Sequence, residues 1–199
     1  MPLSPLLGAV IGDIVGSRFE GRFDGIKTTE FDMIHPRCRF TDDSVMTFAV
    51  ADALLQDQSF GPALHRYGRA YPGRGYGGNF RRWLASDDPQ PYGSYGNGSA
   101  MRASPISWAG ETLEEVLQLA EASARPSHDH PEGIKGAQAV AAAGFLARTG
   151  ASKAEISAYV TETFGYDLSR SIDEIRPGYT FDVSCQGSVP QAIRAFLDS

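Results

Sequence analysis

The feature that most constrains this chain is the recurrence of its apolar residues at the 3.6-residue period of the α-helix. Only Tyr179–Val183 shows a short β-like run, and strands and helices do not alternate along the chain. A parallel sheet is therefore disfavoured, and an all-α fold is expected. The helices expected from periodicity and capping residues are Leu6–Phe19, Thr41–Gln56, Pro62–Tyr71, Phe80–Ala85, Ala100–Trp108, Leu113–Ala124, Pro131–Arg148, Ser152–Phe164 and Val189–Leu197.

Length and charge favour a single domain over residues 1–199. The chain has 199 residues, of which 42% are apolar and 21% charged, as in ordinary globular proteins. Its net charge of −6 argues against general binding to nucleic acid or to an anionic membrane. Cys38 and Cys185 are far apart and are expected to be reduced thiols. Because there is no signal-peptide pattern and no apolar run long enough to span a membrane, a cytoplasmic protein is expected.

The first expected helix carries glycines at every fourth position, Gly8, Gly12 and Gly16. Each costs about 1 kcal/mol relative to alanine, so another backbone or a ligand is expected to approach this face closely. Asp13 and Glu20 are seven positions apart and are expected on one face of the same helix. They are candidates for a general base or for support of a metal site, and a solvated acidic face is the alternative.

The segment Thr41-Asp42-Asp43-Ser44 stands at the start of the second expected helix. Two carboxylates and two hydroxyls offer the hard oxygen ligands that Mg²⁺, Mn²⁺ or Ca²⁺ prefers. The alternative is ordinary helix capping, because Thr is a fair N-cap and acidic residues suit the first turn. These four residues alone leave both interpretations open.

Residues 72–99 form a long connection that is rich in glycine, proline and tyrosine. Long loops inside compact domains are usually functional or disordered, and the aromatic residues argue against disorder. The segment Tyr92–Arg102 carries Gly96 and Gly98 just before the expected helix Ala100–Trp108. Backbone amides at the start of such a helix would bind a phosphate, with Arg102 as an additional donor or as a salt-bridge partner.

The segment Ser127–Glu132 contains two histidines, His128 and His130. Without a third ligand nearby they are a weak signal for zinc, and capping, hydrogen bonding or substrate contact is favoured. A serine hydrolase is disfavoured because the chain has no G-x-S-x-G motif.

Five segments, taken together and in order, resemble the ADP-ribosylglycohydrolase family. The resemblance covers nearly the whole chain, and each motif is weak by itself. The motifs are G-A-x-x-G-D-x-x-G-S-x-x-E-G over 8–21, T-D-D-S-x-M-T over 41–47, G-S-Y-G-N-G-S-A-M-R over 93–102, S-H-x-H-P-E-G-I-K-G over 127–136 and C-Q-G-S-V-P-Q-A-I over 185–193.

The resemblance implies an orthogonal multi-helix bundle with long glycine-rich loops, and a two-metal centre of Mg²⁺ or Mn²⁺. It implies a metal-dependent hydrolase that cleaves the glycosidic bond of an ADP-ribosyl group, with an ADP-ribosylated substrate or ADP-ribose as ligand. The roles it implies are metal binding for Thr41, Asp42 and Asp43, catalysis for Glu20 and Asp43, and substrate binding for Gly93, Ser94, Tyr95, Gly96, Asn97, Gly98 and His128.

One family motif, Gly-x-Asp-x-Asp-Thr, is missing from this sequence, although in the family it supplies the other half of the metal ligands. The domain is therefore expected to be incomplete at its C-terminal side. We expect exposed apolar surface that is covered by self-association or by a complementing C-terminal polypeptide. The alternatives to an enzyme are a non-catalytic ADP-ribose- or nucleotide-binding module, a degenerate family member, and an interaction protein that reuses the fold.

Overall fold

The computed structural model describes residues 3–20 and 27–199, with side chains from residue 6 onward. Residues 1–2 and 21–26, which include Gly21 of the first motif and parts of the predicted domain, lie outside the described residues. Nine α-helices and one 3-10 helix are present in the described part: α1 (Leu3–Gly16), α2 (Asp42–Leu55), α3 (Phe60–Ala70), α4 (Gly78–Ala85), η1 (Ile106–Trp108), α5 (Leu113–Ala124), α6 (Pro131–Arg148), α7 (Lys153–Phe164), α8 (Ile172–Ile175) and α9 (Cys185–Asp198).

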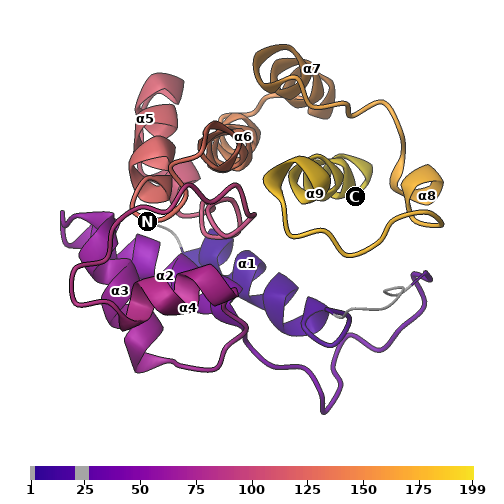
Figure 1. Cartoon of the computed structure of the whole chain (residues 1–199). Coiled ribbons are helices and arrows are strands. Elements are labelled where there is room, and N and C mark those ends of the chain that lie inside the picture. The colour runs from indigo at the N-terminus through magenta and orange to yellow at the C-terminus, as the bar shows by residue number, and fades with distance from the viewer. Residues whose placement is uncertain (1–2, 21–26) are drawn as a thin grey trace.

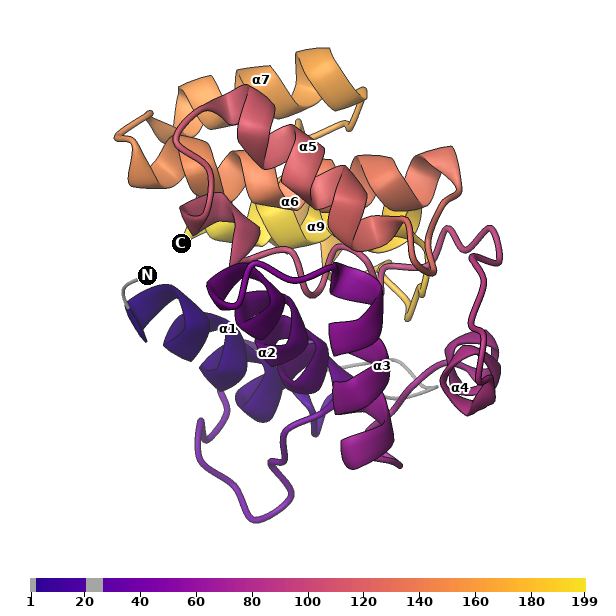
Figure 2. The same ribbon diagram turned by 90° about the vertical axis from the view of Figure 1, so that its left-hand side faces the viewer.

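The helices form two groups that meet along α6. In Figure 1, α1–α4 lie below, and α5, α6, α7 and α9 lie above them. Figure 2 shows α3 standing across the direction of α6 and α7, as expected of an orthogonal bundle. One buried apolar cluster joins α2, α3 and α4 to α5, and the other joins α7 to α9. The all-α prediction is therefore confirmed.

Helix α6 contributes to both clusters because it is lined with small residues on opposite faces. Ala137 and Ala141 pack into one cluster, and Ala139 and Ala142 pack into the other. A Cβ added at Gly136 would lie 2.4 Å from the Cys185 sulfur. The alanine-rich sequence of α6 therefore lets α9 approach closely, and α9 in turn holds the loop described below.

Two elements differ from those expected. The segment predicted as a helix over Ala100–Trp108 is a series of turns that ends in the short η1, since Pro105 has no amide hydrogen and disfavours helical backbone at Ser104. Within the described residues no strand occurs at Tyr179–Val183, and the single β-bridge joins Gly96 to Ser184.

Helix boundaries also differ at the two ends of the chain. Helix α9 begins at Cys185 rather than Val189, because Ser184 caps it by accepting a hydrogen bond from the Gly187 amide. Pro190 therefore lies inside α9 and not in its first turn. Helix α1 ends at Gly16, so Glu20 lies beyond the helix. The prediction that Glu20 shares a helical face with Asp13 is therefore wrong.

Helix α1 presents an open face. Side chains placed at Gly8, Gly12 or Gly16 would meet no described atom within 4 Å, so no described residue makes the expected close approach. Leu7 is 55% exposed and Ile11 is 52% exposed. The prediction of exposed apolar surface is therefore confirmed.

Both cysteines are free thiols, with Cys185 buried and Cys38 partly buried. Among the helices described over 3–20 and 27–199, none combines the length and the apolar character required to cross a lipid bilayer.

Candidate functional site

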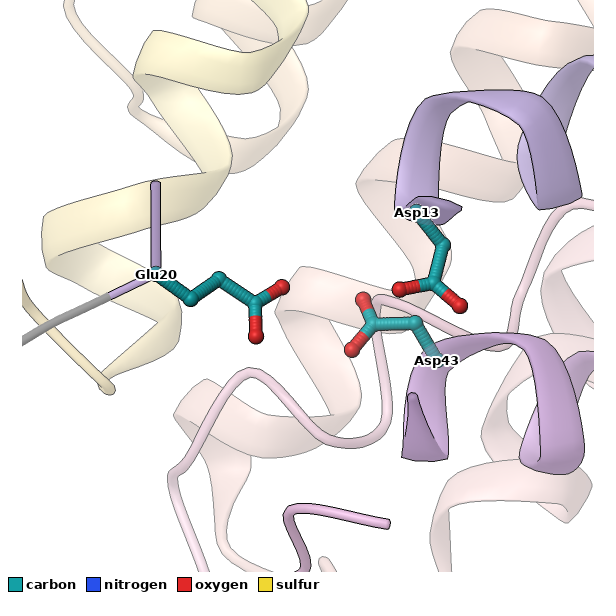
Figure 3. Close-up of side chains that lie close together, drawn as sticks. All are labelled: Asp13, Glu20 and Asp43. Atoms are coloured by element: carbon teal, nitrogen blue, oxygen red, sulfur yellow. The ribbon is translucent and has the colours of Figure 1, made fainter. Parts of the chain in front are cut away.

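Three carboxylates converge between α1 and α2. Asp13 lies in the last turn of α1, Glu20 follows the turn after α1, and Asp43 lies in the first turn of α2. One oxygen from each lies within 4.8 Å of the others. Figure 3 shows the Glu20 carboxylate pointing toward those of Asp13 and Asp43. The expected association of Asp13 with Glu20 therefore occurs, and α2 adds Asp43 to the pair. These three residues are called the acidic cluster below.

Asp13 is the member that fixes the geometry of the cluster. Its Oδ2 accepts hydrogen bonds from the amides of Thr41, at 2.8 Å, and Ser44, at 3.2 Å. Its Oδ1 accepts the Thr41 hydroxyl at 2.6 Å, and the Ser44 hydroxyl also donates to Oδ2. These amides belong to the unpaired N-terminal turn of α2. The Asp13 carboxylate thus joins the end of α1 to the start of α2.

Thr41 is the N-cap of α2, as predicted, and its hydroxyl oxygen accepts the Asp43 amide at 3.3 Å. Asp43 is therefore held in the first helical turn, where the helix dipole favours a negative charge. The capping interpretation of the Thr41–Ser44 segment is therefore confirmed, and the same cap brings the Asp43 carboxylate to Asp13 and Glu20. Metal binding by this segment stays a prediction.

The acidic cluster carries more negative charge than its surroundings balance. Desolvation first, and then the charge of Asp13, raises the pKa of Asp43 to about 6. Desolvation, then the charges of Asp43 and Asp13, raises the pKa of Glu20 to about 7, and Arg39 only partly opposes this. Within the described residues these three carboxylates form no ion pair with a lysine or arginine. Hard oxygen donors with uncompensated charge fit a divalent cation.

Asp42 lies next to the acidic cluster but is not a member of it. Its amide donates to the Arg74 carbonyl at 2.9 Å, and its Oδ1 would lie 2.5 Å from a Cβ at Gly75. Gly75 has a φ of +115°, which also requires glycine. Desolvation first, followed by the Asp43 charge, raises the pKa of Asp42 to about 7. The structure therefore directs Asp42 toward the loop before α4.

The predicted substrate loop over 93–98 is held firmly between α6 and α9. The Asn97 amide donates to the Val183 carbonyl at 2.7 Å, and the Cys185 amide donates to the Tyr95 carbonyl at 2.9 Å. The Cys185 thiol donates to the Gly96 carbonyl at 3.2 Å. On the other side, the Gly93 amide donates to the Asp129 carboxylate at 2.7 Å. The loop conformation is thus fixed by contacts within the protein.

These contacts alter the expected anion site. Three loop amides, those of Gly93, Gly96 and Asn97, already donate to protein oxygens. Because residues 100–105 form turns, the loop also does not lead into the start of a regular helix. The loop side chains remain accessible to different degrees, with Tyr95 53% exposed and Ser94 partly buried.

The two predicted histidines lie on either side of the loop. His128 is buried, with its ring beneath Gly98. His130 caps α6 by accepting the Glu132 amide at 3.1 Å, and its ring lies 5.4 Å from that of Tyr95. Capping, one of the roles favoured above, therefore accounts for His130. Neither histidine belongs to a group of potential metal ligands among the described residues.

Sequence reasoning missed the role of the segment 182–188. It lies far from the loop in sequence, yet Val183, Ser184 and Cys185 provide the contacts that define the loop. The one sequence signal for this role was the motif that begins at Cys185 and contains Gly187 and Ser188. Gly187 is required there because any side chain would collide with the Asp182 carboxylate.

The described chain thus combines an all-helical fold, an acidic cluster between α1 and α2, and a glycine loop fixed by hydrogen bonds to other segments. A family model described as ADP-ribosylglycohydrolase matches residues 4–196. The chain therefore belongs to the ADP-ribosylglycohydrolase family.

Individual proteins show the same relationship. ADP-ribosylhydrolase ARH3 of Mus musculus and that of Homo sapiens are each 32% identical to the chain over 183 aligned residues. Each match covers 75% of this chain and 50% of the relative, so the chain spans about half the length of these relatives. A solved structure titled ADP-ribosylglycohydrolase-related protein complex is 26% identical, with a TM-score of 0.65, and covers 98% of this chain and 73% of that one.

Proposed function

We propose that this chain takes part in hydrolysis of the glycosidic bond of an ADP-ribosyl group, with a divalent cation as cofactor. The observation that carries the proposal is the convergence of Asp13, Glu20 and Asp43 in a chain of this family. The related ARH3 proteins are named as ADP-ribosylhydrolases, which supports the substrate class.

Asp43 of the acidic cluster is proposed to hold the cation, with Thr41 beside it at the start of α2. Asp42 is proposed as a further ligand and would have to turn its carboxylate away from Gly75 to reach the cation. Asp13 would act mainly as their support, because its oxygens already accept hydrogen bonds from Thr41 and Ser44. A bound Mg²⁺ or Mn²⁺ would supply positive charge that polarises the oxygens of the sugar. It would also offset the charge repulsion that raises the pKa of Asp43.

Glu20 is the proposed acid–base group. Its pKa of about 7 lies near neutral pH, where one carboxylate both accepts and releases protons effectively. In the proposed role, Glu20 accepts a proton from the water that attacks the anomeric carbon, and the departing acceptor atom, whose bond to that carbon breaks, takes up a proton from Glu20. Its position at the exposed rim of the cluster leaves room for that water.

The loop over 93–98 is proposed to bind the diphosphate and ribose of the ligand, with His128 contributing from below. Because its conformation is set by α6 and α9, little ordering entropy would be lost when the ligand binds. The same observation supports the second candidate function, a non-catalytic ADP-ribose-binding module that uses the loop alone.

The open face of α1 is proposed to be covered in the working protein, by a second copy or by a complementing polypeptide. The exposed Leu7 and Ile11 support this, and so does the absence of described atoms near Gly8 and Gly12. Sedimentation over a range of protein concentrations tests self-association. Binding of a peptide that restores full activity would support the complementing polypeptide.

The deciding experiment compares the wild-type chain with the Glu20→Gln variant. Turnover of an ADP-ribosylated peptide is expected to fall by about 10²–10⁴-fold, the usual contribution of a general acid–base. ADP-ribose affinity, measured by calorimetry, is expected to remain within about threefold, which is less than one weak hydrogen bond. Full turnover in the variant would contradict the role of Glu20.

The same preparation separates the enzyme from the binding module. If EDTA abolishes turnover and weakens ADP-ribose binding, the enzyme is supported. If wild-type chain binds ADP-ribose equally with and without EDTA and turns nothing over, the binding module is supported.

A further inference from the structure

A buried guanidinium lies at the C-terminal end of α5. Arg102 is 1% exposed, and its Nη2 donates to the Ser123 carbonyl at 2.7 Å and to the Ser127 hydroxyl at 3.2 Å. Among the described residues no carboxylate pairs with it. Ser123 lies in the last turn of α5, where the unpaired carbonyls and the helix dipole favour a cation. The end of α5 therefore takes the place of an acidic partner.

The Ser127 hydroxyl has only one arrangement that satisfies its neighbours. It is fully buried, and its oxygen lies 2.8 Å from Nδ1 of His128. Arginine has donors and no acceptor, so Ser127 accepts from Arg102. The remaining serine proton then has His128 Nδ1 as its acceptor, the one available among the described residues. A proton on Nδ1 would leave the serine proton buried without a partner, which is costly.

His128 is therefore an acceptor at Nδ1. Burial, together with the nearby charge of Arg102, lowers the pKa of His128 well below its usual value, so the ring is neutral at pH 7. Of the other titratable groups around it, Tyr92 lies with its ring 6.1 Å away, and Asp129 is engaged by the Gly93 amide. A neutral ring whose Nδ1 is unprotonated carries its proton on Nε2.

The Nε2 atom lies directly beneath the loop. A Cβ at Gly98 would lie 2.8 Å from it, and a Cβ at Gly96 would lie 3.7 Å from it. Within the part of the chain that the structure describes, no residue accepts a hydrogen bond from Nε2. A side chain that is 4% exposed thus keeps one unpaired donor at the loop.

We propose that Arg102 and Ser127 are positioning residues, which hold His128 as the neutral Nε2–H tautomer and so present one hydrogen-bond donor to an acceptor oxygen of the bound ligand. We call this chain of hydrogen bonds the relay; it runs from the Ser123 carbonyl at the end of α5 through Arg102 and Ser127 to His128. The identity of the ligand as ADP-ribose rests on the proposed function, whereas the tautomer is a property of the protein without ligand.

Nitrogen-15 NMR of labelled histidine in the wild-type chain tests the tautomer directly. The chain has four histidines, and His128→Gln assigns the relevant signals. The expected spectrum has an unprotonated Nδ1 and a protonated Nε2 that persist from about pH 8 down to about pH 5.5, below the ordinary histidine pKa. A proton on Nδ1, or an imidazolium at pH 7, would overturn the proposal. Apart from the assignment by His128→Gln, this result is read from the wild-type chain alone.

The Ser127→Ala variant tests the relay. Without the serine proton, Nδ1 loses its donor, and the spectrum is expected to show a mixture of the two neutral tautomers. ADP-ribose affinity is expected to fall about tenfold, as for one lost hydrogen bond. Arg102→Lys provides a second variant, because the compact ammonium of lysine does not have the shape of the planar guanidinium that places Nη2 between Ser123 and Ser127. It is expected to shift the tautomer balance in the same direction.

The matched control is Ser169→Ala, which removes an exposed serine between α7 and α8. It is expected to change neither the tautomer nor the affinity. If Ser127→Ala folds and keeps the pure Nε2–H tautomer, the relay is wrong. If the wild-type chain shows this tautomer but does not bind ADP-ribose, the proposed function fails while the relay stands.

Discussion

The acidic cluster and the glycine loop are both formed by the described chain, but they differ in how far their polar groups are paired within the protein. The loop over 93–98 has backbone groups paired with Asp129, Val183 and Cys185, and its Gly98 fits against the buried His128 ring. The acidic cluster has three carboxylates within 4.8 Å and no cationic partner among the described residues. The loop is fixed by hydrogen bonds to other segments of the chain, whereas the charge of the cluster is not balanced by a cationic side chain.

This difference separates two ways in which a protein prepares a site. Hydrogen bonds and close packing organise the loop in advance, so a ligand meets a fixed shape. In the cluster, Asp13 fixes the positions, while desolvation and then the charges of neighbouring carboxylates raise the pKa values of Asp43 and Glu20. A bound cation or bound protons would balance this negative charge. A variant that removes a charge from the cluster should therefore weaken cation binding. A variant that distorts the loop should instead weaken binding of ADP-ribose.

The largest effect is expected from Asp43→Asn. The amide keeps the size of the side chain but removes the charged ligand, so both Mn²⁺ affinity and turnover should fall by about 100-fold or more. ADP-ribose binding in EDTA should change little, because the loop is intact. Titration calorimetry and a hydrolysis assay measure these quantities.

Asp52→Asn is the matched control, since Asp52 lies on the same helix and pairs with Arg66. Equal cation affinity in Asp43→Asn and in the wild-type chain would show that the cluster is not the cation site.

Gly98→Ala should have the opposite effect to Asp43→Asn, since it should weaken ADP-ribose binding and not cation binding. Its methyl group would meet the His128 ring at 2.8 Å, and this buried ring has little space to move. ADP-ribose affinity should fall about 10- to 100-fold, which corresponds to about 1–3 kcal/mol of overpacking. Cation affinity should be unaffected.

Gly77→Ala serves as the control, because no described atom lies near that position and its φ is negative. Unchanged ADP-ribose affinity in Gly98→Ala would mean that the loop does not bind this ligand.

Asp13→Asn should weaken the fold itself. An amide nitrogen in place of one oxygen cannot accept the α2 donors, so the free energy of unfolding should drop by about 1–2 kcal/mol. In a chain of this size this lowers the Tm by roughly 2–8 °C. Thermal unfolding measures the change. Asp87→Asn, at a side chain that is 97% exposed, should leave the Tm unchanged, and an equal Tm for Asp13→Asn would refute the anchoring role.

The smallest expected effect is a pH dependence of stability in the absence of metal. The pKa of Asp43 is raised to about 6 in the folded chain, above its unfolded value, so the folded state binds more protons between these values. The associated stability is complete below the unfolded pKa and is lost as the pH rises through about 6. The loss should amount to about 1–2 kcal/mol by pH 8.

Urea unfolding at several pH values, compared between wild type and Asp43→Asn, isolates this contribution. The difference between the two proteins should shrink on adding Mg²⁺. A wild-type stability that rises with pH relative to the variant would have the wrong sign.

Much of the fold followed from local sequence patterns, since the periodic segments of α2, α5, α6 and α7 begin and end near capping residues. The pattern failed at residues 100–105, where Pro105 prevents a regular helix. Apolar periodicity also places the start of α9 too late, because the start is set by the Ser184 side chain, which accepts the Gly187 amide, and not by an apolar residue.

The candidate site was only partly accessible from the sequence. Asp13 and Glu20 were paired on the assumption of one continuous helix, yet a turn after Gly16 brings them together. Asp42 and Asp43 are adjacent in sequence, and neighbouring positions on a helix point about 100° apart, so one joins the cluster and the other faces Gly75. The burial of His128 depends on contacts with α5 and the loop that no local pattern contains.

The most direct test of the cation site is calorimetric titration of the metal-free chain with Mn²⁺ near pH 7, in two buffers of different ionisation enthalpy. Because the cluster holds carboxylates with pKa values of about 6 and 7, saturable binding should be accompanied by proton release to the buffer. Absence of saturable binding, or binding with no release of protons that persists in Asp43→Asn, would contradict a cation site at Asp13, Glu20 and Asp43.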